Sequence, residues 1–546
     1  MKLFSLLLFT FLGINLYAQK LNKQDKLSLQ NITSHVTFLS DDKLEGRRTG
    51  TKGEELASDY IVEQFQKNGL TAKGDNGTFM QKFEINEGKQ VLPSSFFILD
   101  EEHLKEGKDY FPFSWSINGG TEAVASPNLN ESGNIWFWDL KDLLAENENN
   151  PHFDLMNAIR SKEKDAAKKG ATALLIYNSG NKETMLKYDG KDRSALSAIP
   201  VVYLQKRIAA KLAADPSHSF DLKFKTEQGE KTRTGTNVVG YIDNAAATTV
   251  IVGAHFDHLG YGEDRNSRYT GSTPAIHNGA DDNASGTAAL IEISRLLKKN
   301  GSNAYNYLVI AFSGEELGLY GSKYYTEHPT VALSNVNFMV NMDMVGRFND
   351  TARSVTIGGV GTSPSWGILL TEKKPVFTVK VDSSGTGPSD HTSFYRKDIP
   401  VLFFFTGLHT DYHTPSDDFD KINYVGELLI VKYITRLIER SSKEPKLAFT
   451  KTREQQTTTS ARFTVSMGIM PDYTFSGGGV KVDGVSEGRA AQKAGIKTGD
   501  IVVKLGDFAI TSMESYMQAL SKFKKGDATK VKVKRGQEEL EFDIAF

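Results

Sequence analysis

Two histidines and three carboxylates, far apart in the chain, are of the types that bind a metal ion and activate water. They are His255, Asp282, Glu316, Asp343 and His413. The chain contains no cysteine, so any metal site must be built from imidazole and carboxylate. If these five side chains converge, the sequence predicts a hydrolase.

Apolar runs that resemble buried strands precede several of these residues. Residues 250–254 lead to His255, residues 307–312 to Glu315 and Glu316, and residues 337–342 to Asp343. Open α/β sheets bind their ligands at the carboxyl ends of such strands. Adjacent glutamates repel each other unless a cation or a proton is shared, which favours a metal site over an ordinary turn.

Two further features would support the site. Asp257 lies two residues after His255, so both side chains point to the same side of an extended strand, and Asp257 could orient the imidazole. Asp282 lies in an acidic, glycine-rich turn at 278–286 that leads into a helix. Taken alone, the first feature could be a surface pair and the second an ordinary helix N-cap.

Strands and helices alternate over residues 237–440, which predicts a mixed central sheet with helices on both faces, an α/β fold. A helical pattern runs from 27 to 70, with Gly69 as its expected C-cap. We expect one catalytic domain from 19–87 and 231–440, interrupted by an insertion at 88–230.

The short motifs resemble one peptidase family. They are His-x-Asp at 255–257, Gly-Ala-Asp-Asp-Asn-Ala-Ser-Gly at 279–286, Gly-Glu-Glu-Leu-Gly-Leu-Tyr-Gly-Ser at 314–322, Asn-Met-Asp-Met-Val-Gly at 341–346 and Tyr-His-Thr-Pro at 412–415. In this order they are similar to the double-zinc aminopeptidases, a family that also contains glutamate carboxypeptidase and the transferrin receptor. Residues 39–50 are similar to the start of that family's domain.

The resemblance implies a zinc exopeptidase fold and a role for each residue. Asp282 would bridge two zinc ions, with His255 and Asp343 completing one site and Glu316 and His413 the other. Glu315 would be the general base, and Tyr412 would donate to the developing oxyanion. The donor types suit zinc, but cobalt and manganese accept the same ligands.

Two accessory domains are also indicated by resemblance. The insertion, expected to be mostly β, contains a helix, Gly170-Ala171, a strand at 173–177 and Ile-Pro-Val-Val at 199–202, and it resembles the protease-associated domain. Residues 485–502 resemble the core of a PDZ domain, with 466–470 as its carboxylate-binding loop. We expect an exposed linker at 441–460 and a small α+β PDZ domain at 461–546, which would bind a peptide or a protein C-terminus.

The first 18 residues follow the plan of a signal peptide, with Lys2, an apolar run to about residue 12, and Ala18 before the expected cleavage. The alternative is an uncleaved membrane anchor, but the run is short for a spanning helix, and no other stretch could span a bilayer. The net charge of -2 gives no indication of a nucleic-acid or anionic-membrane partner. The expected location is periplasmic or secreted.

Several functions remain open at this point. The first is an aminopeptidase acting on peptides, and the nearest alternatives are a dipeptidase and a carboxypeptidase that binds the terminal carboxylate through Arg347 or Arg396. A further possibility is a non-catalytic peptide-binding scaffold, since the family includes members that have lost the metal ligands. The last is glutaminyl cyclisation, but relatives with that activity tend to have Trp where Tyr412 stands.

Overall fold

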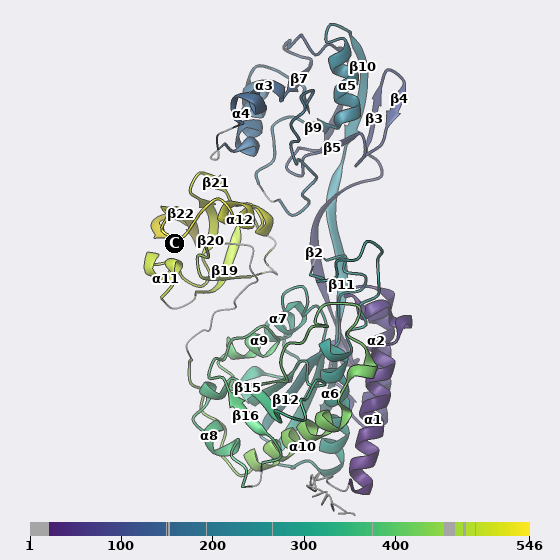
Figure 1. Cartoon of the computed structure of the whole chain (residues 1–546), viewed down its shortest axis with the longest axis vertical. Helices are drawn as coiled ribbons and strands as arrows, with labels where there is room; N and C mark the ends of the chain where they lie inside the picture. The colour runs from purple at the N-terminus through teal and green to yellow at the C-terminus, as the bar shows by residue number, and fades with distance from the viewer. Residues whose placement is uncertain are drawn as a thin grey trace, which may run out of the picture.

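A computed structural model describes residues 21–546, except 149, 151–152, 193, 265, 374, 453–464, 473–474, 476 and 486–487. The expected signal peptide, and residue 461 where the PDZ domain was expected to begin, lie outside the described residues. No helix in the described part combines the length and the apolarity that crossing a membrane requires. Figure 1 shows a large α/β domain, an elongated insertion lobe above it and a smaller C-terminal domain between the two.

A mixed sheet of nine strands forms the centre of the large domain. Its order is β1-β11-β13-β12-β14-β17-β15-β16, with β2 paired to β11. The strands are β1 (Thr71–Ala72), β2 (Met80–Val91), β11 (Gln228–Ile242), β12 (Thr248–His255), β13 (Tyr305–Phe312), β14 (Val336–Met342), β15 (Ser354–Gly358), β16 (Thr378–Val381) and β17 (Val401–Phe405). The four strands β13, β12, β14 and β17 are parallel, whereas β11 and β15 pair antiparallel. Every residue of β13 and β14 is buried, which explains their continuous apolar sequences.

Helices cover both faces of this sheet, as the alternating pattern predicted. One face carries α1 (Lys23–Leu39), α2 (Lys52–Lys67), α6 (Gly286–Asn300), α8 (Trp366–Leu369) and α10 (Tyr424–Ser441). The other face carries α7 (Tyr320–Glu327) and α9 (His391–Tyr395). The α/β fold with a mixed central sheet is therefore confirmed.

Two expected helices differ from those observed. The pattern over 27–70 is interrupted by a helical turn at Asp42–Arg47, where Glu45 and Gly46 take positive φ angles, so it forms two helices instead of one. The alternating pattern over 237–440 also predicted a helix at 316–328, which begins only at Tyr320, because Gly314 and Leu319 adopt left-handed conformations and place a tight turn after β13. That turn carries both glutamates.

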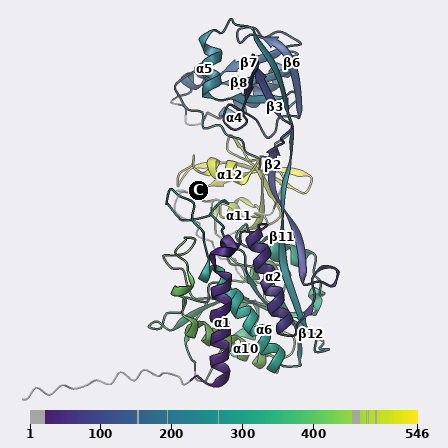
Figure 2. The same ribbon diagram turned by 90° about the vertical axis from the view of Figure 1, so that its right-hand side faces the viewer.

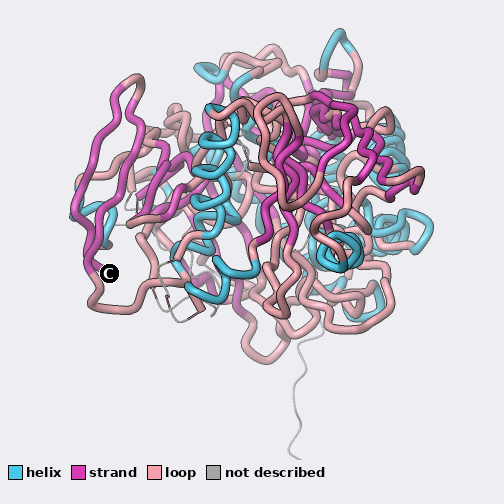
Figure 3. Tube along the Cα trace, turned by 90° about the horizontal axis from the view of Figure 1, so that it is seen from above, coloured by secondary structure: helices cyan, strands magenta, loops and turns pink. Residues whose placement is uncertain are grey.

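The insertion lobe, comprising the residues between β2 and β11, extends from the sheet on a ribbon formed by these two strands, which remain paired from Met80 and Val238 to Val91 and Gln228. One lobe sheet has the order β4-β3-β10-β6 and the other β5-β9-β8-β7. Its strands are β3 (Phe96–Leu99), β4 (Glu102–Leu104), β5 (Tyr110–Pro112), β6 (Gly119–Ala125), β7 (Ile135–Asp139), β8 (Ala173–Tyr177), β9 (Val201–Leu204) and β10 (Phe220–Thr226), and its helices are α3 (Lys141–Glu146), α4 (Leu155–Lys168) and α5 (Lys206–Ala214). Figure 3 shows the chain from above, with helices in cyan and strands in magenta.

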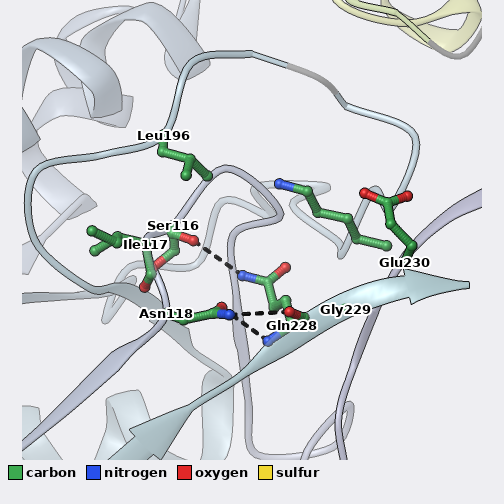
Figure 4. A pocket seen from close by; sticks show the side chains of 8 residues that line it. Ser116, Ile117, Asn118, Leu196, Gln228, Gly229 and Glu230 are labelled. Carbon is green, nitrogen blue, oxygen red and sulfur yellow. Dashed lines mark hydrogen bonds between the residues drawn. The ribbon is translucent and has the colours of Figure 1, made fainter.

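A pocket of about 360 Å³ lies where the ribbon enters the lobe. Gln228 is central to it: its side-chain amide nitrogen donates to the main-chain oxygen of Ser116, and its backbone exchanges two hydrogen bonds with the Asn118 side chain (Figure 4). The same amide nitrogen also donates to the main-chain oxygen of Phe113. These bonds fix the lobe to the last residues of the ribbon.

In its described residues the C-terminal domain has a six-stranded sheet and two helices. They are β18 (Ile469–Pro471), β19 (Val480–Val485), β20 (Ile501–Leu505), β21 (Phe508–Ala509), β22 (Ala528–Arg535), β23 (Glu538–Ala545), α11 (Ala490–Ala494) and α12 (Met513–Leu520). Figures 1 and 2 both place this domain beside the ribbon. It contacts α7 and α9 of the large domain through ion pairs of Lys323 with Asp472 and of Arg396 with Asp483.

The start of the segment expected to be an exposed linker, residues 441–460, is instead attached to the large domain. Leu447 is buried in the domain's main apolar cluster, and its amide donates to Asn337 at 2.8 Å. The Thr452 amide donates to the Tyr395 hydroxyl. Residues 446, 448, 450 and 451 are exposed, so the structure departs from the expected exposure at Leu447. Sequence periodicity does not reveal a single buried residue of this kind.

Candidate metal centre

The carboxyl ends of three neighbouring strands bring the site together. His255 is the last residue of β12, Asp343 directly follows β14, and Glu315 and Glu316 lie in the turn after β13. Because β12 pairs in parallel with both β13 and β14, these ends meet at one edge of the sheet. Asp282 approaches this edge from the turn Ala280–Ser285 that precedes α6.

His255, Asp343 and Asp282 form what we call the inner half of the centre. The His255 Nε2 atom lies 3.4 Å from Asp282 Oδ1 and 3.4 Å from Asp343 Oδ1. All three side chains are buried or nearly so. The three atoms could hold one cation.

His413, Glu316 and the same Asp282 form the outer half. The His413 Nε2 atom lies 3.2 Å from Asp282 Oδ2 and 3.2 Å from Glu316 Oε2. Asp282 therefore directs one carboxylate oxygen to each half. All five residues that the sequence indicated as ligands meet at this place.

These distances fit zinc. Ligand atoms at about 2.0–2.1 Å from a tetrahedral zinc ion are about 3.3–3.4 Å from one another. The separations of 3.2–3.4 Å within each half are close to this value. The neutral imidazoles and carboxylates are also ligand types that zinc accepts.

The imidazole of His255 is oriented mainly by the backbone. Its Nδ1 atom is 3.2 Å from the main-chain oxygen of Asp257 but 3.6 Å from the carboxylate Oδ1, which is long for a hydrogen bond. The Asp257 carboxylate instead accepts the Thr49 hydroxyl at 2.9 Å and the Glu315 amide at 3.2 Å. Asp257 thus holds the turn that carries Glu315, a contact that the sequence did not indicate.

The sequence interpretation missed His258. Its Nδ1 atom lies 2.8 Å from Glu316 Oε1, the oxygen that does not face His413, and 4.0 Å from Asp282 Oδ2. His258 therefore belongs to the outer half, either as a hydrogen-bond donor that orients Glu316 or as an additional ligand. His258 directly follows the His-x-Asp motif at 255–257, and this adjacent polar side chain was the sequence feature that could have indicated its role.

His413 is held by loop contacts. Its Nδ1 lies 2.8 Å from the main-chain oxygen of Asn266, so a proton on Nδ1 would leave the Nε2 lone pair free to bind a cation held together with the carboxylates. Its ring stacks on that of Tyr412, with the centroids 3.9 Å apart. Burial and the nearby carboxylates, Asp282 foremost, raise the pKa of Tyr412, so its hydroxyl keeps its proton at neutral pH.

Glu315 lies at the inner half without completing it, since its nearest carboxylate oxygen is 4.0 Å from His255 Nε2. Burial raises its pKa well above the usual range; His255 opposes this effect, while the charges of Asp343 and Glu316 add to it. A buried carboxyl group of high proton affinity suits a general base.

The two arginines considered as carboxylate anchors are already paired with acidic side chains. Arg347 lies 3.0 Å from Asp411 and 3.2 Å from Asp417. Arg396 contacts Asp483 of the C-terminal domain. An incoming carboxylate would have to displace one of these partners.

Comparisons with known proteins agree with this geometry. Residues 237–435 match Peptidase family M28, and residues 450–546 match the PDZ domain. Aminopeptidase YwaD of Bacillus subtilis is 29% identical over 276 residues, which cover 48% of this chain and 55% of that protein. A probable leucine aminopeptidase of Arthroderma otae is 26% identical over 225 residues, covering 39% of this chain and 58% of that protein. The chain thus spans little more than half the length of these relatives.

A solved structure of BSAP, a zinc aminopeptidase from Bacillus subtilis, is 21% identical and covers 77% of this chain and 98% of its own, with a TM-score of 0.43. The M28 match includes every strand end of the metal centre, and the PDZ match includes the whole described C-terminal domain. Residues 237–435 are therefore similar to Peptidase family M28, and residues 450–546 are similar to the PDZ domain.

Proposed function

We propose that this chain is a metallo-exopeptidase with two zinc ions, an aminopeptidase that releases N-terminal residues from peptides. The observation that carries the proposal is the position of Asp282, whose two oxygens each face a different histidine at 3.2–3.4 Å. His255 and Asp343 would hold one ion, and Glu316 and His413 the other. Similarity to aminopeptidases supports the activity.

Two zinc ions in such a site lower the pKa of water and polarise the scissile carbonyl. The remaining steps fall to side chains of this chain. Glu315 would take a proton from the attacking water and return it to the leaving amine, which its burial and high proton affinity favour. The protonated Tyr412 hydroxyl would donate to the oxyanion of the tetrahedral intermediate.

The contacts of the site favour an aminopeptidase over the alternatives. A carboxypeptidase needs a cation for the terminal carboxylate, and both Arg347 and Arg396 are engaged by carboxylates. A tyrosine at 412, where cyclising relatives tend to have tryptophan, speaks against glutaminyl cyclisation. The complete set of donors and Glu315 speaks against a scaffold.

Exchange of each of the two adjacent glutamates tests the proposal. Glu315→Gln should retain both ions and lose about 10²- to 10⁴-fold in kcat, the usual contribution of a general base. Glu316→Gln, the matched control one residue away, should lose metal from the outer half. Metal content and hydrolysis of aminoacyl reporters, free and N-blocked, would be measured. Near wild-type turnover of Glu315→Gln, or equal cleavage of N-blocked reporters, would contradict the proposal.

For the accessory regions we propose that residues 88–230 are a protease-associated domain and that the PDZ domain, expected at 461–546, binds an extended peptide or C-terminus at a sheet edge. The ion pairs to α7 and α9 support substrate recruitment, because α7 follows the turn that carries Glu315. A chain ending at Thr452 should lose activity on long peptides more than on aminoacyl reporters. An equal loss on both would argue against recruitment.

We also propose that residues 1–18 are removed and that the mature protein is periplasmic or secreted. The proposal rests on the composition of this segment. N-terminal sequencing of the exported protein should begin at Gln19, and retention of Met1 on a membrane fraction would favour the anchor.

A further inference from the structure

Arg47, from the segment at residues 39–50, lies beneath the metal centre and has no part in the mechanism above. Its side chain is completely buried. The guanidinium donates to four main-chain oxygens: those of Leu39, Phe256 at 2.7 Å, Asn278 at 2.7 Å and Gly279 at 3.0 Å. Within the described residues, all its hydrogen-bond acceptors are thus uncharged carbonyl groups.

Three of the four acceptors belong to the segments that carry His255 and Asp282 of the inner half. Phe256 lies directly after His255, while Asn278 and Gly279 begin the turn that presents Asp282. Leu39 is the last residue of α1. One rigid, planar side chain therefore connects the end of β12, the Asp282 turn and a helix from the other end of the sequence.

The backbone around Arg47 strengthens the same connection. The His258 amide donates to the Arg47 carbonyl at 3.2 Å, and the Gly260 amide donates to the Gly46 carbonyl at 3.1 Å. At Gly46, with φ of +67°, a Cβ atom would lie 2.5 Å from the main-chain oxygen of His277, so this position requires glycine.

The positive charge of Arg47 also interacts with carboxylates of the metal centre. Burial lowers its pKa to about 10, with Asp257, Asp282, Asp417 and Glu316 acting in the opposite direction, so the guanidinium stays charged at neutral pH. A fixed positive charge beneath a cluster of carboxylates reduces their mutual repulsion whether or not a cation is bound.

We propose that Arg47 is a positioning residue: it fixes the separation of His255 and Asp282 and thereby sets the affinity of the inner half for zinc. The inference rests on the proposed binuclear chemistry, but the quantity that it predicts to change is the zinc-binding affinity and not the catalytic rate. It differs from a purely structural role, in which the loss of Arg47 would lower stability and leave metal affinity unchanged.

Three variants separate these roles. Arg47→Met removes the charge and all four hydrogen bonds, and Arg47→Lys keeps the charge with three donors in place of the planar guanidinium. Arg440→Met is the matched control, because Arg440 also donates to a main-chain oxygen, that of Leu369, but on the helical face at α8 and α10. Folding by circular dichroism, thermal unfolding with and without zinc, and zinc affinity by chelator competition would be measured on the full chain.

Arg47→Met should bind one of its two zinc ions about 10- to 100-fold more weakly, as expected for loss of a group that orients ligands. Arg47→Lys should lie between this variant and the wild type. Arg440→Met should unfold at lower temperature with unchanged zinc affinity. Wild-type zinc affinity in a folded Arg47→Met would overturn the proposal. If Arg47→Met does not fold, wild-type zinc affinity in Arg47→Lys would overturn it. A wild-type protein that binds zinc but cleaves no peptide would reject the proposed function and leave the affinity comparison valid.

Discussion

The two halves of the metal centre are built in different ways. The inner half depends on the sheet: His255 closes β12, Asp343 follows β14, and the two strands are paired neighbours. The outer half depends on loops: Glu316 lies in the turn after β13, and His413, in a left-handed conformation, is held by the carbonyl of Asn266. The inner geometry inherits the rigidity of buried backbone, whereas the outer geometry depends on a few hydrogen bonds between loops.

Asp282→Asn should have the largest effect, because it removes the one carboxylate that both halves share. The amide has a single oxygen and cannot direct an anionic oxygen to each side. Loss of a residue that only orients a ligand weakens metal binding by up to about 100-fold. Because Asp282 is itself a proposed ligand of both ions, both zinc affinities should fall by more than this. Metal content after dialysis checks this, with exposed Asp350→Asn as the control. Loss from one half only would show that the halves are independent.

Chelation should release the two ions in sequence, the outer one first. Its ligands are held by loops that open more readily than buried strands. The time course of zinc release to a coloured chelator should therefore show a fast and a slow phase. Glu316→Gln should retain only the slow phase and Asp343→Asn only the fast one. A fast phase that persists in Glu316→Gln would reverse the assignment.

His258→Leu should have the smallest effect and touch only the outer half. The change removes the hydrogen bond to Glu316 Oε1. One zinc ion should bind about 10- to 100-fold more weakly while the other is unaffected. His277→Leu is the control, since His277 is also buried nearby but contacts Ser267 and the main chain of Ala275. Equal weakening of both ions would mean that His258 supports the whole centre.

The same contrast explains what the sequence could predict. Apolar runs before His255 and Asp343 predicted strands that end at one edge of a sheet, and the structure has those strands. In the outer half, Glu316 also follows an apolar run that predicted a strand, whereas His413 was indicated by its motif alone. The roles of His258, the Asn266 carbonyl and Thr49 were not predicted, because they arise from contacts between loops distant in sequence, for which local patterns carry no signal. The break between α1 and α2 was missed for a similar reason: Gly46 lies against the main chain of Gly260 and His277, which are distant in sequence.

The ribbon of β2 and β11 has a consequence for how this molecule could be assembled. Val91 and Gln228 are direct partners at its far end, so the lobe begins and ends at adjacent points. To the nine-stranded sheet, everything between them is equivalent to the loop of a hairpin, and a two-residue turn could close the same strands without changing their register. The lobe could therefore be lost, replaced or enlarged while the nine-stranded sheet keeps its pairing.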